Sequence, residues 1–136
     1  MNSTLYLIVI VVVTLGVIGF GEYFRRKPAK LQTAIYRERW LELQKHCADK
    51  KTWPLAIIDA DNLLDKALRA RKYKGKTTGE RLVAAQHSLS SNDGVWFGHK
   101  LRNRVVHEDV RKLRKQDVLE ALNGFRQALK DLGALD

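Results

Sequence analysis

The hydrophobic residues of the chain follow two patterns, one continuous and one periodic. The continuous run, Leu5 to Phe20, contains no charged residue. With Thr4 and Gly21 it reaches 18 residues, the lower limit for crossing a hydrocarbon core about 30 Å thick at ~1.5 Å per residue. Because lipid offers no partner to backbone amides, such a segment must be helical. We therefore predict a transmembrane anchor over residues 1–24.

A cleaved signal peptide is the alternative interpretation of this run. No basic residue precedes the run and no small-x-small cleavage site follows it, which favours an uncleaved anchor. Residues 25–30 then form a basic juxtamembrane linker, whose cations are Arg25, Arg26, Lys27 and Lys30. Basic residues favour the cytoplasmic side of a membrane. We predict a single-pass protein of the cell inner membrane, with residues 31–136 in the cytoplasm.

Beyond residue 30 the apolar residues recur with helical spacing, and the alternation typical of strands is missing. Helices are predicted over about 31–48, 52–72, 77–88, 95–107 and 116–132. Helices of these lengths with short links indicate an all-α fold, an antiparallel bundle of four or five helices in one domain, residues 31–136. Each apolar stripe is incomplete, so some apolar surface remains for a homodimer.

The charge balance narrows the choice of partners. The formal net charge is +10, and most of it remains when the linker is left out. A positive domain attracts nucleic acid or anionic lipid headgroups, although a solvated surface rich in Lys and Arg would look the same. The lone Cys47 allows no internal disulfide.

Candidate chemistry is concentrated in residues 96–108, which we place on the predicted helix over about 95–107. Residues four apart share a helix face, and this helix has an apolar line of Phe97, Leu101 and Val105 and a polar line of His99, Asn103 and His107. We expect the apolar line to be buried. His99 and His107 are eight residues apart, or ~12 Å along a helix, so one metal ion cannot bridge them. We therefore predict no metal and no cofactor.

Arg102 and His107 together supply the groups that metal-free cleavage of RNA requires. A histidine transfers protons near neutral pH, and an arginine stabilises charge on phosphate oxygens. Asn103 could orient the imidazole or a phosphate oxygen. The nucleophile would be the ribose 2′-hydroxyl, so the substrate would be RNA and not DNA. The alternative is that His107 is a helix-end residue bonded to Glu108 or to backbone.

The pattern Arg102-Asn103-x-x-x-His107 resembles the Arg-polar-x-x-x-His signature of the HEPN superfamily. The lead-in His99-Lys100-Leu101, the Thr78-Gly79-Glu80 turn and the late position of the motif are also similar, over about residues 35–133. HEPN domains are small helical bundles, usually dimeric, and many are metal-independent endoribonucleases in toxin–antitoxin systems. The resemblance implies Arg102 and His107 as the catalytic pair, with Asn103 between them.

The same resemblance implies that two copies of the motif face each other across a homodimer, which would bring together both copies of Arg102 and Arg104. It also implies an antitoxin or another protein as a further partner. Some HEPN domains bind RNA, nucleotides or protein without cutting.

Asp61 lies on the same predicted helix face as Ile57, Leu64 and Leu68. A carboxylate in such a place is costly unless it is paired. One interpretation is that Asp61 fixes Arg102 or a histidine. The other is that it bonds to backbone or lies at the boundary of the core, in reach of water.

Two functions fit these residues. The leading hypothesis is a membrane-anchored HEPN-like domain that acts on RNA as a metal-independent endoribonuclease. The alternative is a non-catalytic, membrane-tethered helical adaptor that binds a protein partner, RNA or anionic lipid, with Arg102, Asn103 and His107 in structural roles. The exposure of His107 separates the two, since a histidine open to a cleft favours the enzyme and one sealed under the last helix favours the adaptor.

Overall fold

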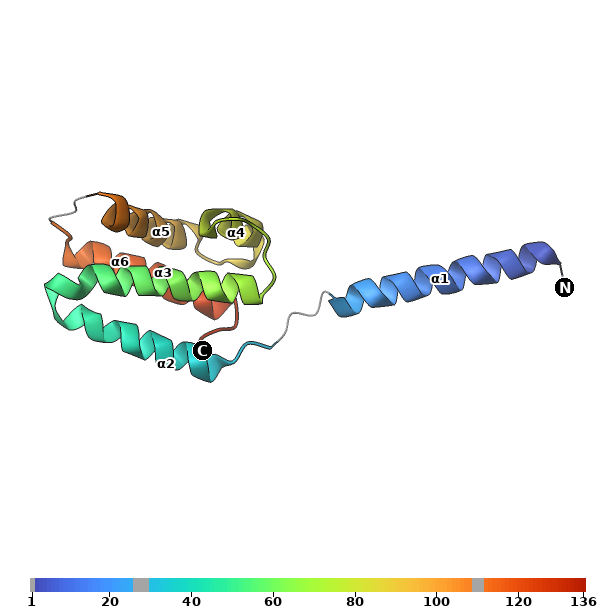
Figure 1. Cartoon of the computed structure of the whole chain (residues 1–136), viewed down its shortest axis with the longest axis horizontal. Helices are drawn as coiled ribbons and strands as arrows, with labels where there is room; N and C mark the ends of the chain where they lie inside the picture. Colours follow the sequence, from blue (N-terminus) through green and yellow to red (C-terminus); the bar gives the residue numbers. More distant parts are fainter. Residues whose placement is uncertain (1, 26–29, 109–111) are drawn as a thin grey trace.

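A computed structural model of the chain describes residues 2–25, 30–108 and 112–136. These residues contain six α-helices and no strand, which confirms the predicted all-α class. Figure 1 shows one separate N-terminal helix, α1, and a bundle in which α2, α3, α5 and α6 run lengthwise beside one another, with the short α4 at one end.

Helix α1, Ser3–Arg25, has the length and composition expected of the predicted anchor. At ~1.5 Å per residue its 23 residues extend about 34 Å, and the large apolar side chains from Leu5 to Phe20 are all more than half exposed. The Thr14 hydroxyl donates to the carbonyl oxygens of Ile10 and Val11, so its polar group is satisfied within the helix. The segment Ser3–Gly21 is long and apolar enough to cross a membrane, a property that N-terminal signal sequences share. Residues 26–29 of the predicted basic linker lie outside the described residues.

The described residues of the bundle form five α-helices and short 3₁₀ segments. The elements are α2 (Thr33–Gln44), two 3₁₀ turns (Lys45–Ala48 and Lys50–Thr52), α3 (Trp53–Ala70), α4 (Thr78–Ala85), a third 3₁₀ turn (Gln86–Ser88), α5 (Asn92–His107) and α6 (Lys115–Asp131). The most deeply packed element is α3, which contacts α2, α4, α5 and α6. Its buried face contains one charged residue, Asp61, among small and large apolar side chains.

The start of α4 is set locally, as its sequence predicts. Thr77 Oγ1 accepts a hydrogen bond from the Glu80 backbone N–H at 3.2 Å, and the Glu80 carboxylate accepts one from the Lys76 N–H. The first bond satisfies a backbone donor that a helix start leaves free, and the second holds the residue before the cap. The capping residues therefore fix where α4 begins, next to α3 and α5.

The start of α5 differs from the prediction. The helix begins at Asn92, three residues before the predicted Val95, and residues 92–94 form its first turn instead of a separate loop. The reason is a close approach to α6, because a Cβ atom on Gly124 would lie 2.1 Å from the Gly94 carbonyl oxygen. One turn further along, a Cβ atom on Gly98 would lie 2.8 Å from the Phe125 ring. Glycine on both helices lets the two backbones touch.

The buried face of α5 also differs from the prediction. Of Phe97, Leu101 and Val105, only Leu101 is buried, and the other two are half-buried. The buried residues of α5 are Val95, Gly98, His99 and Leu101. Since Gly98 faces α6, the helix is rotated so that His99, predicted to lie on a polar face, points into the protein.

Candidate functional site

Asp61 of α3 and His99 of α5 meet inside the bundle. Asp61 is 1% exposed and His99 is 8% exposed, and Asp61 Oδ1 lies 2.7 Å from His99 Nδ1. Because a carboxylate can only accept, Nδ1 carries the hydrogen and donates it to Asp61. Of the two interpretations of Asp61, the structure shows the paired one. The bond leaves Nε2 as the free end of the imidazole.

Arg102 and Asn103 extend this contact into a polar cluster, defined here as Asp61, His99, Arg102 and Asn103. Arg102 Nη1 donates to Asn103 Oδ1 at 3.0 Å, and Asn103 Nδ2 lies 3.5 Å from His99 Nε2. Arg102 Nε forms an ion pair with Asp61 Oδ2 at 3.5 Å, but this buried nitrogen has no hydrogen-bond partner among the described residues. The cluster thus places a guanidinium and an amide beside the free end of His99.

A cavity of about 500 Å³ opens beside the polar cluster, between the start of α4 and α5. It is lined by Arg69, Lys76, Thr77, Thr78, Gly79, Arg81, His99, Arg102 and Asn103, and it is called the basic cavity here. A Cβ atom on Gly79 would lie 3.6 Å from His99 Nε2. Nε2 therefore faces the first turn of α4, at a position where the chain has no side chain.

The far side of the basic cavity is held together by Asp65 of α3. Its carboxylate accepts from Arg81 Nε at 2.7 Å, from Thr78 Oγ1 at 3.0 Å and from Arg69 Nε at 2.8 Å. Burial raises the pKa of Asp65, but the hydrogen bonds from Arg81, Thr78 and Arg69 outweigh it and hold this pKa below its ordinary value. The bonds from Arg81 and Thr78 tie α4 to α3, and the bond from Arg69 lies within α3.

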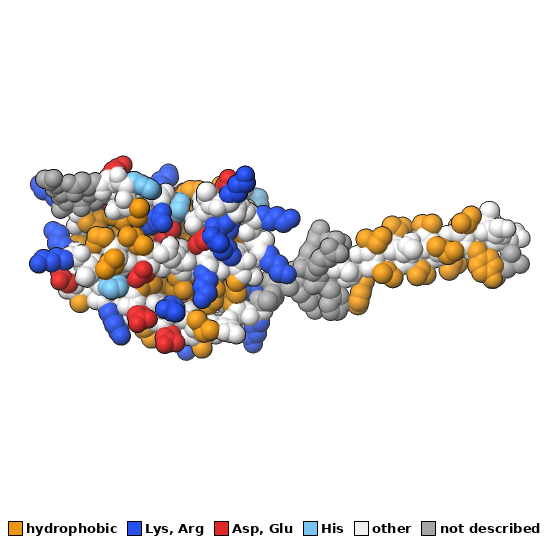
Figure 2. All heavy atoms as spheres, viewed as in Figure 1, with side chains coloured by type: hydrophobic (Ala, Val, Ile, Leu, Met, Phe, Trp, Pro, Cys, Tyr) orange, Lys and Arg blue, Asp and Glu red, His pale blue; other side chains and the backbone are white. Residues whose placement is uncertain are grey.

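The electrostatics of the basic cavity favour an anion. Among the described residues four cationic side chains line it, and three carboxylates contact these residues, those of Asp61, Asp65 and Glu80. Elsewhere on the bundle, Figure 2 shows Lys and Arg side chains spread over the visible face with acidic ones between them. A cavity with a local excess of positive charge is suited to a phosphate group.

His107 and Arg104 lie outside the polar cluster. His107 is exposed in the last turn of α5, about 12 Å along the helix from His99. It is not sealed under α6, and it is not among the residues that line the basic cavity. Arg104 is also exposed, with its Nε 3.9 Å from Glu108 Oε2. Within one chain, Arg102 and Asn103 are thus joined to His99 and Asp61, and His107 stands apart from them.

The cationic side chains that lie around the start of α4 were not predicted as part of the site. Lys76 and Arg81 flank the capping pair Thr77 and Glu80, and their proximity to Arg102 depends on how α4 packs. The only local signal was Asp65, a second carboxylate one helical turn after Asp61.

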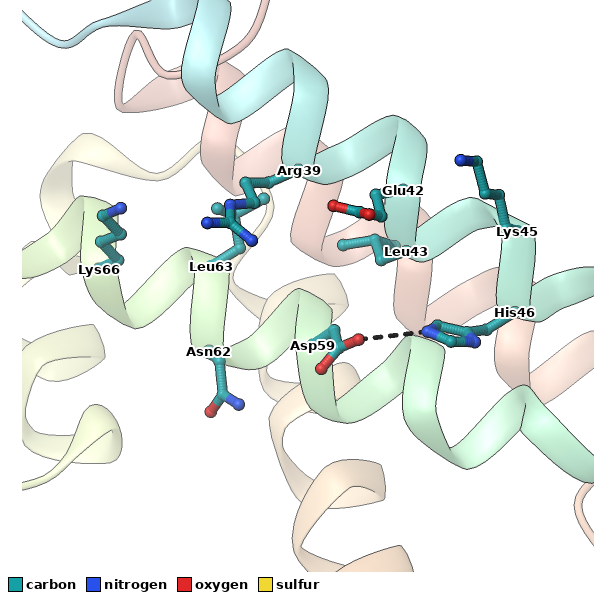
Figure 3. A pocket seen from close by; sticks show the side chains of 9 residues that line it. All are labelled: Arg39, Glu42, Leu43, Lys45, His46, Asp59, Asn62, Leu63 and Lys66. Atoms are coloured by element: carbon teal, nitrogen blue, oxygen red, sulfur yellow. Dashed lines mark ion pairs between the residues drawn. The ribbon is translucent and has the colours of Figure 1, made fainter.

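A second hollow, of about 610 Å³, lies between α2 and α3 and is shown in Figure 3. The ion pair drawn in Figure 3 joins His46 Nε2 and Asp59 Oδ2 at 3.5 Å. The charged side chains around it are of both signs, Arg39, Lys45 and Lys66 against Glu42 and Asp59. Because these charges offset one another, this hollow selects neither an anion nor a cation, and the basic cavity is the better candidate site.

No group of three His, Cys, Asp or Glu side chains placed to hold a metal ion occurs within residues 2–25, 30–108 and 112–136. Comparison of the chain with protein-family models, with curated proteins and with solved structures found no match. The HEPN resemblance therefore stays a prediction.

Proposed function

We propose that this chain is a HEPN-like protein that acts on RNA, and that it is a metal-independent endoribonuclease. The observation that carries the proposal is the position of Arg102 and Asn103. These two residues of the signature are bonded to each other and stand at a basic cavity, held there by a buried carboxylate. A guanidinium fixed in this way is suited to a phosphodiester, whose paired oxygens match its donors.

The proposed reaction is attack of the ribose 2′-oxygen on the adjacent phosphorus. It leaves a 2′,3′-cyclic phosphate and a free 5′-hydroxyl, and it therefore requires RNA. Arg102 would stabilise the charge that grows on the phosphate oxygens, while Asn103 keeps the guanidinium in place. His107 would transfer a proton. Because His107 stands apart from the cavity of its own chain, we propose a homodimer in which His107 of one copy reaches the phosphodiester held by the other.

The proposed location is the inner membrane, with the bundle in the cytoplasm. The support is the exposed apolar helix α1 and the basic residues that follow it in the sequence. Anchoring would confine RNA cleavage to the membrane surface.

The test uses the full chain in phosphatidylcholine nanodiscs, with end-labelled RNAs in EDTA. We expect cleavage that leaves 2′,3′-cyclic phosphate, and a loss of about 100-fold or more in Arg102→Ala and His107→Ala. Arg126→Ala, which removes an exposed arginine of α6, is the matched control and should cleave normally. A folded protein that cuts none of a varied set of RNAs would contradict the proposal.

A non-catalytic adaptor is the second candidate, and a groove between α2 and α6 favours it. The groove has a volume of about 580 Å³ and is lined in part by Trp40, Leu41 and Leu119. Leu41 and Leu119 are 57% and 50% exposed, and the buried Trp40 Nε1 has no hydrogen-bond partner among the described residues. If the chain is an adaptor, Leu119→Asp should abolish binding of its protein partner.

A further inference from the structure

The Asp61–His99 pair has three features that a purely structural pair does not need. Its imidazole lines the basic cavity instead of being enclosed on all sides. The residue opposite Nε2 on α4 is Gly79, so no side chain at that position covers the nitrogen, and Asn103 Nδ2 lies beside it at 3.5 Å. The guanidinium of Arg102 belongs to the same cluster, through its ion pair with Asp61. A ligand in the cavity would meet Nε2 and the guanidinium together.

The orientation of the imidazole is that of a proton-transfer residue. A buried carboxylate that accepts from Nδ1–H fixes the tautomer, turns Nε2 outward and stabilises the imidazolium that forms when Nε2 takes a proton. Here that carboxylate is Asp61, at 2.7 Å. The other charges that line the cavity around His99 are those of Arg102 on α5, Arg81 on α4, Lys76 before α4 and Arg69 on α3.

We propose that His99 is a catalytic residue of the site and that its Nε2 accepts the proton of the ribose 2′-hydroxyl. This inference rests on the proposed ribonuclease function and deepens it, since it separates the roles of the two histidines. His99 lies beside Arg102 in the same chain, whereas His107 is about 12 Å away along α5. The reacting phosphodiester therefore binds in the cavity of one chain, and His107 of a second copy serves its far side.

The 2′-hydroxyl proton moves to His99 Nε2 while the 2′-oxygen forms its bond to phosphorus. The bond between phosphorus and the 5′-oxygen breaks, and that oxygen takes a proton from His107 of the second copy. Exchange with water then returns both histidines to their starting forms. Asp61 is a positioning residue, because it acts on the substrate only through His99.

The experiment separates base from acid with a modified substrate. An RNA that carries a single 5′-bridging sulfur has a leaving group that departs as a thiolate and needs no proton donor. On ordinary RNA we expect His99→Asn and His107→Ala, each in full-length protein in nanodiscs, to lose about 100-fold or more. On the sulfur-containing RNA we expect His107→Ala to recover most of the wild-type rate and His99→Asn to stay slow.

His99→Asn is the sharpest variant, because its amide keeps an N–H near the position of Nδ1 for Asp61 and removes Nε2. If it does not fold, Gly79→Ala replaces it. That substitution places a methyl group 3.6 Å from Nε2, an ordinary contact distance, and should slow cleavage with His99 and Asp61 in place.

The outcomes distinguish the two proposals. If His99→Asn, or Gly79→Ala in its stead, cleaves ordinary RNA at the wild-type rate, the role of His99 is wrong, and the ribonuclease proposal stands as long as Arg102→Ala and His107→Ala are inactive. Recovery of His99→Asn in place of His107→Ala on the sulfur-containing RNA also overturns the assignment. If the folded wild-type protein cuts no RNA, both proposals fall.

Discussion

Replacement of Gly124 by alanine tests how tightly α5 and α6 are packed. The new Cβ atom would lie 2.1 Å from the Gly94 carbonyl oxygen and 2.4 Å from its carbonyl carbon. Both atoms belong to the backbone, so no side-chain rotation can relieve the contact. The two helices must separate by roughly 1 Å to restore a van der Waals distance, and that movement also opens the contact between Gly98 and Phe125.

The cost follows from two opposing terms. Overpacking of a close contact costs about 3 kcal/mol when only backbone can move. Alanine recovers at most ~1 kcal/mol, because glycine is the poorer helix former. We therefore expect Gly124→Ala to lower the free energy of unfolding by about 2 kcal/mol, which corresponds to roughly 10 °C in Tm for a domain of this size.

Urea unfolding of the full chain in detergent micelles, followed by far-UV circular dichroism, measures this change. The matched control is Asn123→Ala, an exposed neighbour in the same helix, which should stay within about 0.5 kcal/mol of the wild type. A Gly124→Ala protein as stable as the control would refute the close approach of the two backbones.

Two further substitutions test the bonds that place α4. Asp65→Asn should cost about 3 kcal/mol, because it removes the charged partner of the buried Arg81. The pKa of Asp65 is lowered in the folded state, so its contribution is complete above the unfolded value near 4 and is lost as the pH falls through the folded value. The stability difference between wild type and Asp65→Asn should therefore shrink in urea titrations as the pH falls below about 4, and a constant difference would contradict the ion pair. Thr77→Ala removes the N-cap of α4 and should cost about 1 kcal/mol in the same assay, against no change for Thr77→Ser.

The helices were predictable because the signals that define them are local. Apolar spacing recurs within each segment, and the Thr77–Glu80 pair marks the start of α4 in the sequence itself. The start of α5 was not predictable in the same way. Gly94 belongs to the helix because it meets Gly124, a residue 30 positions later, and no local pattern records that contact.

The candidate site also contains residues that local sequence could predict and residues that it could not. Arg102 and Asn103 could be singled out from a short motif, and Asp61 from its place on an apolar helix face. The partner of Asp61 could not be chosen, because it depends on the rotation of α5 about its own axis. The prediction that Phe97 and Val105 would be buried assumed a different rotation of α5. In the rotation that the structure shows, His99 points inward.

The bond between Asp61 and His99 joins residues 38 positions apart, and this separation sets when the site forms during folding. Individual helices form within about a microsecond, and α5 and α6 are neighbours in the chain, so their pairing has a small loop-closure cost. The imidazole is oriented only after α3 has packed against α5. This contact joins residues far apart in the sequence, so we expect it to form later. We therefore expect partly folded or newly synthesised chains to hold the Arg102 motif in a helix while His99 is not yet oriented. The candidate site is complete only when the whole bundle has folded.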